Sequence, residues 1–198
     1  VNMIIDLNLK GKQVLIVGGG VESSRKVEAL LSQQCNITVV AEKVEKAIKD
    51  HAEKGKISLE LRKIHHVDTI NKFKYVDLIL ATTDDRKLNR EIVLFGKSHR
   101  CYVYAADDPH VSDFSHPSII NIDDTVQVAI STGGRSPLLG KALREQVEPI
   151  IKKAVSKLII DQIKLQEQFR IKIQKYIPST EYRKKFLIEI INNKNINK

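Results

Sequence analysis

Gln13-Val-Leu-Ile-Val-Gly-Gly-Gly-Val-Glu-Ser23 joins a short apolar run directly to a turn of three glycines. An apolar run of this kind predicts a strand that is buried on both faces of a sheet. After the turn, Val27, Leu30 and Leu31 recur at helical spacing, so we expect a helix over residues 22–33. A strand and a helix joined by G-x-G-x-x-small are typical of a dinucleotide-binding βαβ unit.

The positions of the glycine turn have separate physical roles in such a unit. Gly18 allows the tight turn, Gly20 allows the close approach of a pyrophosphate, and Ser23 lets the helix contact the sheet closely. Free N–H groups and the positive end of the helix dipole then face the phosphates. The expected cofactor contacts of the turn are Gly18, Gly19, Gly20, Val21, Glu22 and Ser23. The alternative is a glycine-rich turn that binds no ligand.

Short apolar runs alternate with helical segments through the first half of the chain. The further predicted strands cover residues 36–41, 57–61, 76–83 and 101–105, and the helices between them cover 44–52 and 86–98. This alternation predicts right-handed βαβ crossovers and a parallel sheet. We therefore expect an α/β fold with a Rossmann-type parallel sheet, whose ligands bind at the carboxyl ends of the strands.

The pattern changes after residue 115. Residues 118–122 and 125–130 flank Asp123-Asp124, which predicts a hairpin or an added antiparallel edge. From Pro137 nearly to its end the chain is predicted to be helical, and its apolar residues at a period of 3.6 between 147 and 163 need a partner surface. The expected parts are an NAD-binding Rossmann domain at 1–114, a small dimerisation and substrate segment at 115–145, and a C-terminal helical region at 146–198 with frayed residues from 192 onward.

Composition excludes several classes of protein. The two cysteines, Cys35 and Cys101, lie far apart and have no histidines at ligand spacing, so neither a disulfide framework nor a zinc site is predicted. The net charge of +9 comes from scattered residues, with no Trp for stacking, so we expect no nucleic acid as partner. The positive charge is compatible with a polyanionic small molecule as ligand. The alternative is that the lysines only keep the surface solvated. Without a leader or an apolar stretch of about 20 residues, we expect a soluble, cytoplasmic protein without membrane partners.

Two further segments are expected to border the cofactor. Glu42 and Lys43 follow the second predicted strand, where an acidic residue bonds the adenine ribose of NAD and a cation favours the 2′-phosphate of NADP. We expect NAD. After the fourth strand, the backbone of Ala81, Thr82 and Thr83 is expected at the edge of the same cleft. This segment also has the residues of a helix N-cap, and both roles are compatible.

A possible second site begins at Asp107-Asp-Pro109, directly after the fifth predicted strand. A carboxylate at this edge can accept a proton while hydride leaves for nicotinamide. The same three residues are also well suited to an ordinary turn. Position alone does not separate the two interpretations.

Four motifs, taken in order, resemble the dehydrogenase and ferrochelatase module of siroheme synthases. They are Val17-Gly-Gly-Gly-Val21 before Arg25-Lys26, Ala81-Thr-Thr-Asp-Asp85 before Asn89, Phe114-Ser-His-Pro-Ser-Ile-Ile120, and Val128-Ala-Ile-Ser-Thr-Gly-Gly-Arg-Ser-Pro137 with Leu138-Leu-Gly-Lys-Ala-Leu-Arg-Glu145. The resemblance covers residues 3 to about 150, and the rest resembles the family only in being helical. Since no methyltransferase region is present, we expect the stand-alone form of the module.

The resemblance implies oxidation of precorrin-2 to sirohydrochlorin with NAD as hydride acceptor. It places the family's catalytic aspartate at Asp107 and the cofactor contacts at the glycine turn with Glu42, Lys43 and residues 81–83. Tyr104 departs from the family, in which an asparagine is common at this position. The resemblance and the amphipathic C-terminal helix both favour a homodimer.

The family's substrate, a tetrapyrrole rimmed with carboxylates, suggests a use for the loop before Pro137. Ser136 is the predicted N-cap of the next helix, and such a loop exposes N–H groups to anions. The expected substrate contacts are Ser131, Thr132, Gly133, Arg135, Ser136 and His116. Arg135, Lys141 and Arg144 would then steer or clamp the carboxylates, or they are ordinary surface residues.

Insertion of ferrous iron, as in some members of the family, is left open. Metallation needs a base and a way to hold the ion, which Asp107 with His116, or His110, would supply. No metal ligand is predicted with certainty, because single histidines in loops are more often solvated and His65-His66 would point apart in a strand. A different hypothesis is an NAD-sensing regulatory domain without catalysis, which explains the first hundred residues but not Asp107 or the loop before Pro137.

Overall fold

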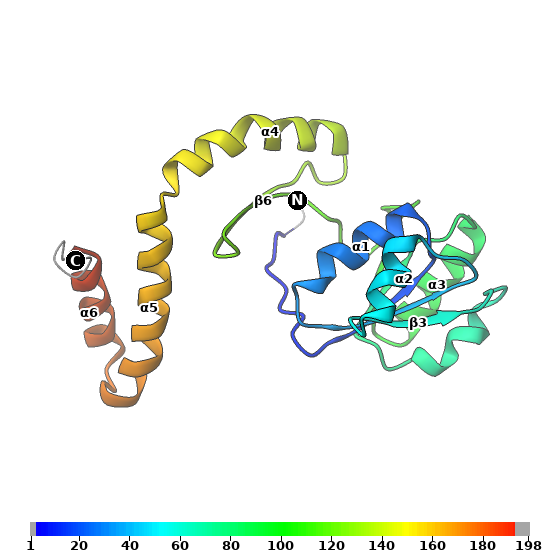
Figure 1. The fold of residues 1–198 in the computed structure, drawn as a ribbon, viewed down its shortest axis with the longest axis horizontal. Helices are drawn as coiled ribbons and strands as arrows, with labels where there is room; N and C mark the ends of the chain where they lie inside the picture. The colour runs from blue at the N-terminus through cyan, green and yellow to red at the C-terminus, as the bar shows by residue number, and fades with distance from the viewer. Residues whose placement is uncertain (1–2, 193–198) are drawn as a thin grey trace. The chain divides into compact units, whose positions relative to one another are not determined.

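The computed structural model describes residues 3–192. They form two compact units, which divide between His116 and Pro117 (Figure 1). The first unit contains the predicted parallel sheet and the second contains the predicted hairpin and the C-terminal helices. Each unit is described by itself below.

The sheet of the first unit has five parallel strands. They are β1 Gln13–Val17, β2 Asn36–Ala41, β3 Ser58–Leu61, β4 Leu78–Ala81 and β5 Tyr102–Ala105. Their order is β3-β2-β1-β4-β5, so the chain runs outward from β1 in one direction and then returns to its other side. The strands on both sides of β1 are parallel to it, which confirms the predicted Rossmann-type fold. The reversal of order beside β1 is the topological switch point where such sheets bind ligands.

Helices cover both faces of this sheet. On one face, Val14 and Ile16 of β1 pack in a buried cluster with Val27 of helix α1 (Val21–Leu31) and Ile48 of helix α2 (Lys46–Glu53). The other face has its own buried cluster, formed by alternate residues of β1 and by helix α3 (Arg86–Ser98). Burial on both faces explains why the strand sequences are almost continuously apolar.

The structure differs from the sequence predictions between β3 and β4. A 3-10 helix, η1 (Val67–Phe73), occupies a stretch without a predicted element and buries Ile70. His65 and His66 lie in the bend before η1 and not in a strand, so the strand geometry in which they would point apart does not apply to them. Short helices of this kind have too few turns to produce a readable apolar period.

The second unit begins with the predicted hairpin. Strands β6 (Ser118–Ile122) and β7 (Val126–Ile130) pair antiparallel. Asp123 and Asp124 at the turn have φ of 52° and 49°. Two consecutive positive φ angles give the turn a twist that matches the twist of the strands, and Asp tolerates this conformation better than most residues.

Three helices follow the hairpin: α4 (Pro137–Ala154), α5 (Lys157–Tyr176) and α6 (Thr180–Asn192) (Figure 1). The apolar period predicted to continue across Val155 is interrupted there, because Ser156 accepts a hydrogen bond from Ile159 N at 3.4 Å and starts a new helix. Fraying was expected for residues 192–198; Asn192 is the last residue of α6, and residues 193–198 lie outside the described part. Among the described helices, none is long and apolar enough to cross a lipid bilayer.

Candidate functional site

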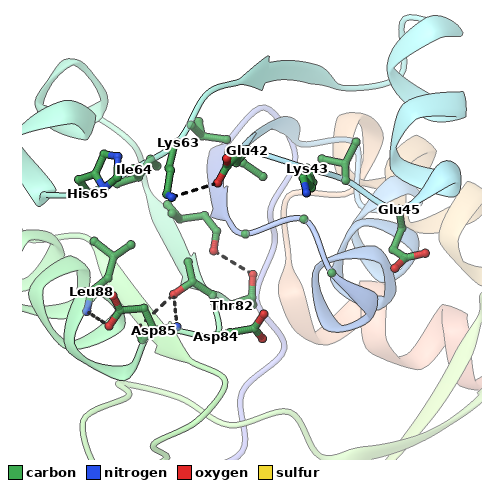
Figure 2. A pocket seen from close by; sticks show the side chains of 18 residues that line it. Glu42, Lys43, Glu45, Lys63, Ile64, His65, Thr82, Asp84, Asp85 and Leu88 are labelled. Carbon is green, nitrogen blue, oxygen red and sulfur yellow. Dashed lines mark hydrogen bonds and ion pairs between the residues drawn. The ribbon is translucent and has the colours of Figure 1, made fainter.

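A cavity of about 580 Å³ lies in the first unit, where β1, β2 and β4 end (Figure 2). This volume is in the range of small-molecule sites. Its lining comes from segments that are far apart in the sequence, which are the glycine turn, the end of β2, the segment after β3 and the loop before α3. The expected cofactor residues in the lining are Gly18, Gly19, Gly20, Glu42, Lys43, Thr82 and Thr83. Those that do not line it are Val21, Glu22, Ser23 and Ala81.

The three glycines of the turn face different surroundings. Gly18 has φ of +128°, and a Cβ atom there would lie 2.5 Å from Thr82 O. A Cβ atom on Gly19 would lie 1.9 Å from Lys43 O, so this glycine allows close contact with the loop after β2. Nothing lies within 4 Å of a Cβ atom placed on Gly20, so the space beside it is open to a ligand. The sequence pattern predicted the open position at Gly20 but not the contact of Gly19.

Helix α1 starts at this turn without a side-chain cap. Its N-cap is Gly20, which has no side chain to accept from the first N–H groups of the helix. Ser23, on the first turn, is fully buried, and its Oγ lies 2.8 Å from Thr82 Oγ1, so it joins the helix to the sheet. The uncapped N–H groups and the helix dipole therefore make the open side of Gly20 suited to an anion.

Charged side chains surround the far end of the cavity. Glu42, directly after β2, has a carboxylate oxygen 3.7 Å from Lys63 Nζ, and both side chains are more than half exposed (Figure 2). Lys43, Glu45 and His65 also line this part. Sequence reasoning missed Lys63, because it lies in an irregular segment after β3 that has no motif. Glu42, Lys43 and Lys63 therefore bring one carboxylate and two ammonium groups to the lining of this cavity.

Asp107 lies outside this cavity, at the end of β5. Its side chain is 22% exposed, and its Oδ2 lies 4.0 Å from Arg86 Nε. It lines a second cavity of about 320 Å³ with Arg86, Arg90, Asp108 and Val111. Asp108 has the turn role, since its Oδ1 accepts from the backbone N–H of His110 at 2.9 Å. Asp108 therefore has the turn contact, and Asp107 is left to its contacts in the second cavity.

Asn89 of α3 forms hydrogen bonds to one residue of each cavity, Thr83 and Asp107. Its Nδ2 donates to Asp107 Oδ1 at 2.8 Å and to Thr83 O at 2.9 Å. Its Oδ1 accepts from Thr83 N at 3.1 Å and from Thr83 Oγ1 at 2.7 Å. Sequence reasoning used Asn89 only as part of a motif, because a contact across 18 residues between a helix and a loop leaves no local pattern.

His116 lies in an aromatic cluster. Its ring centroid is 4.8 Å from that of Tyr104 and 5.4 Å from that of Phe114, both edge to face. Lys26 of α1 lies over the Tyr104 ring, with Nζ 4.5 Å from its centroid. Desolvation, followed by the charge of Lys26, lowers the pKa of His116 to about 4, although the residue as a whole is exposed to solvent.

The structure does not bring His116 and Asp107 together. Asp107 bonds to α3 on one face of the sheet, and His116 packs on Tyr104, which belongs to the buried cluster of the opposite face. His110 is exposed. Among residues 3–192, no group of three or more His, Cys, Asp or Glu side chains has the arrangement of a metal site.

The loop before α4, in the second unit, is held by its own side chains. Ser131 Oγ accepts from Gly133 N and Thr132 Oγ1 accepts from Ser136 N, both at 3.1 Å. Ser136 is the N-cap of α4, as predicted, and its Oγ accepts from Leu139 N at 3.3 Å. These N–H groups are used internally, so fewer are free for anions than the sequence suggested.

The cations near this loop differ in their availability. Arg144 is paired with Glu145 and Glu148, and Lys141 Nζ lies 4.0 Å from Glu145 Oε1. Arg135 is exposed, and in the described part of the chain it forms no ion pair. Arg135 is therefore the residue of the three whose charge is most open to a ligand.

Comparisons with known proteins agree with this arrangement. A family described as "Putative NAD(P)-binding" matches residues 5–118, and one described as "Sirohaem biosynthesis protein central" matches residues 123–148. The siroheme synthase of Nitrosococcus oceani is 34% identical over 154 residues, which is 78% of this chain and 32% of that protein. The siroheme synthase of Methylococcus capsulatus is 34% identical over 182 residues, which is 92% of this chain and 36% of that protein.

A solved structure is similar over nearly the whole chain. The structure of SirC, described as precorrin-2 dehydrogenase, has a TM-score of 0.73 and 27% sequence identity, and the match covers 96% of this chain and 89% of that one. By contrast, the chain spans about a third of the length of the siroheme synthases that it matches.

Proposed function

The chain belongs to the family of NAD(P)-binding modules found in siroheme synthases, and on this premise we propose that it oxidises precorrin-2 to sirohydrochlorin with NAD. The reaction removes a hydride and a proton from precorrin-2 and yields sirohydrochlorin, NADH and a proton. NAD supplies the hydride acceptor when it is bound. The chain must then hold the cofactor, accept the proton and bind the polycarboxylate substrate.

The observation that carries the proposal is the open space beside Gly20, at the uncapped start of α1. A diphosphate needs N–H donors and room for its oxygens, and this position has both. Gly18 and Gly19 instead let the turn pack tightly against Thr82 and Lys43. The residues of the turn therefore fit a dinucleotide cofactor.

We propose NAD rather than NADP because of Glu42. Its carboxylate can accept a hydrogen bond from the 2′-hydroxyl of the adenine ribose, and it repels a 2′-phosphate. Lys43 and Lys63 weaken this repulsion, so the expected preference is moderate. A comparison of kcat/KM for the two cofactors in wild type and Glu42→Ala measures the preference directly, and a wild type that prefers NADP would contradict this part of the proposal.

Asp107 is the residue proposed to accept the proton. Its Oδ1 is held by Asn89, whereas the one ion-pair partner of Oδ2 among residues 3–192 is Arg86, whose Nε lies 4.0 Å away. Oδ2 is therefore the oxygen available to a substrate proton. Asp107 lines the second cavity, which has room for part of a ligand.

The charges around Asp107 support a polycarboxylate substrate. Arg86 and Arg90 line the same cavity, and guanidinium groups bind carboxylates well. The further substrate contacts proposed from the family are His116 and the loop residues Ser131, Thr132, Gly133, Arg135 and Ser136. We do not extend the proposal to iron insertion, because Asp107 and His116 bond to opposite sides of the sheet.

We also propose that the chain forms a homodimer. Helix α4 leaves large apolar side chains exposed at Leu138 (77%), Leu139 (61%) and Ile150 (66%). Exposed apolar surface of this extent on one helix is typical of an interface. Sedimentation velocity of the intact chain should give twice the 22.4 kDa of one copy, and a single copy at micromolar concentration would contradict the dimer.

The activity is tested by an anaerobic assay with purified chain, precorrin-2 and NAD. We expect NADH to form in a one-to-one ratio with sirohydrochlorin, which absorbs differently from its precursor. Omission of precorrin-2 is the control for background reduction of NAD. Tight binding of NAD without any NADH formation would instead favour a regulatory domain without catalysis.

A further inference from the structure

We infer that Asn89 is a positioning residue that orients the Asp107 carboxylate and joins it to the cofactor loop. The inference rests on the proposed function, because it gives Asn89 a role in the reaction assigned to Asp107. The inference assigns a role in this reaction to a residue of α3 that itself lines neither cavity.

The first argument is the burial of Asn89. Only three polar residues in the described part of the chain are buried, namely Ser23, Thr82 and Asn89, and Asn89 is 1% exposed. Burial of a side-chain amide costs free energy unless all its polar atoms are bonded. Asn89 meets this condition, since both protons of Nδ2 and both lone pairs of Oδ1 are used. The amide is thus held in one place.

The second argument is that these partners determine which way the amide faces. Thr83 N can only donate, so Asn89 Oδ1 must point toward it, and Nδ2 must then point toward Thr83 O and Asp107 Oδ1. Asp107 therefore receives a donor at Oδ1. This contact leaves Oδ2, which lies 4.0 Å from Nε of the cavity residue Arg86, as the oxygen that accepts a proton.

The third argument is the link to the cofactor side. Thr83 lines the cavity of the glycine turn, and three of the four hydrogen bonds of Asn89 go to this one residue. A shift of the Thr83 backbone would therefore move Asn89, and with it the Asp107 carboxylate. The Asn89 amide thus keeps the Asp107 carboxylate at a fixed distance from Thr83, which lines the cofactor cavity. A hydride transfer coupled to removal of a proton requires such a fixed arrangement.

Asn89→Asp tests the inference with almost no change in volume. The new oxygen replaces the donor that faces Asp107 Oδ1, so the two carboxylates repel each other and Asp107 turns away. We expect kcat to fall by about 10-fold to 100-fold, because misplacement of a catalytic group by about 1 Å has effects of this size. The KM for NAD should rise by a smaller factor than kcat falls, because the variant also loses the bond to Thr83 O beside the cofactor cavity but leaves the glycine turn unchanged. Asn71→Asp is the matched control: it adds the same charge at an exposed position in η1 and should leave kcat unchanged.

The pH profile separates positioning from a merely structural role. Two carboxylates in contact do not ionise independently, so in Asn89→Asp the acidic limb of the kcat profile should move to higher pH. Arg86, Arg90 and Asp108 also line the cavity of Asp107, and they are the same in wild type and variant. A loss of folded protein alone would lower kcat at every pH without moving this limb. The NAD-binding stoichiometry gives the folded fraction by which kcat is corrected.

Asn89→Ser is the second variant if Asn89→Asp does not fold. It removes the donor to Asp107 without adding a charge, and it should lower the corrected kcat while NAD still binds. If the wild type is active and either folded variant keeps the wild-type kcat, the role of Asn89 is overturned. The proposed function would then still stand. A wild type that binds NAD but never oxidises precorrin-2 would overturn the proposed function, and with it this inference.

Discussion

At the scale of single residues, Asp107 and Gly20 have separable tasks. Asp107 bonds to Asn89 beside the second cavity, and Gly20 adjoins the first. Replacement of Asp107 by Ala should therefore lower kcat by at least about 100-fold, within the range for a lost general base. The Kd for NAD, measured by calorimetry, should stay within threefold of wild type. Full turnover by the variant would exclude Asp107 as the proton acceptor.

Gly20→Asp should have the opposite effect. No atom lies within 4 Å of a Cβ atom at this position, so the variant can fold, but it places a carboxylate where the diphosphate is proposed to bind. Repulsion between the two anions should weaken NAD binding by about 100-fold or more, since each 1.4 kcal/mol corresponds to a factor of ten. Gly20→Ala is the control for bulk without charge. An unchanged affinity in Gly20→Asp would show that the phosphates bind elsewhere.

His116 gives a prediction about pH. Its folded-state pKa is lowered to about 4 from 6.5 by desolvation and by the charge of Lys26, so between these values the unfolded chain binds the proton more readily. The contribution of His116 to stability is therefore fully present above pH 6.5 and is lost as the pH falls toward 4. Because His116 is exposed to solvent, the change in free energy is small.

The imidazole titration of His116, followed by NMR, tests this directly. Comparison with a His116→Asn variant assigns its signal among the six histidines. We expect a midpoint far below the ordinary value. A midpoint near 6.5 would show that the aromatic cluster with Tyr104 and Phe114 does not form in solution.

At the scale of elements, helix α3 depends on its N-cap. Asp85 Oδ1 accepts from Lys87 N at 2.9 Å and from Leu88 N at 3.0 Å. Asp85→Ala should therefore lower the free energy of unfolding by about 1 kcal/mol, as is typical of a lost cap. Asp84→Ala removes a neighbouring exposed carboxylate that does not cap the helix, and it should have almost no effect. Urea unfolding of the two variants makes the comparison, and equal stabilities would contradict the role of the cap.

The elements could be predicted from the sequence wherever the pattern is local. The apolar run before Gly18 predicted β1, the turn residues predicted the hairpin, and Ser136 predicted the start of α4. The break between α4 and α5 could not be predicted, because the apolar period continues across it and only the cap at Ser156 marks it. The 3-10 helix η1 was missed for lack of a period.

At the scale of the whole molecule, the location of the candidate site could be predicted from the expected fold. The contacts between its side chains could not. A parallel sheet with a glycine turn after β1 places a cofactor at the carboxyl ends of its strands. The approach of Gly19 to Lys43, the ion pair of Glu42 with Lys63, and the bond from Asn89 to Asp107 all depend on how distant loops pack. Tertiary packing, and not local pattern, decides such contacts, so they became visible only in the structure.

The most direct test of the account is a crystal structure of the intact protein with NAD bound. We expect the diphosphate to lie beside Gly20 and to accept hydrogen bonds from the first N–H groups of α1, with the adenine ribose near Glu42. Asp107 should keep its bond to Asn89 with Oδ2 open to the second cavity. NAD bound away from the glycine turn, or Asp107 released from Asn89 and turned into solvent, would contradict the account.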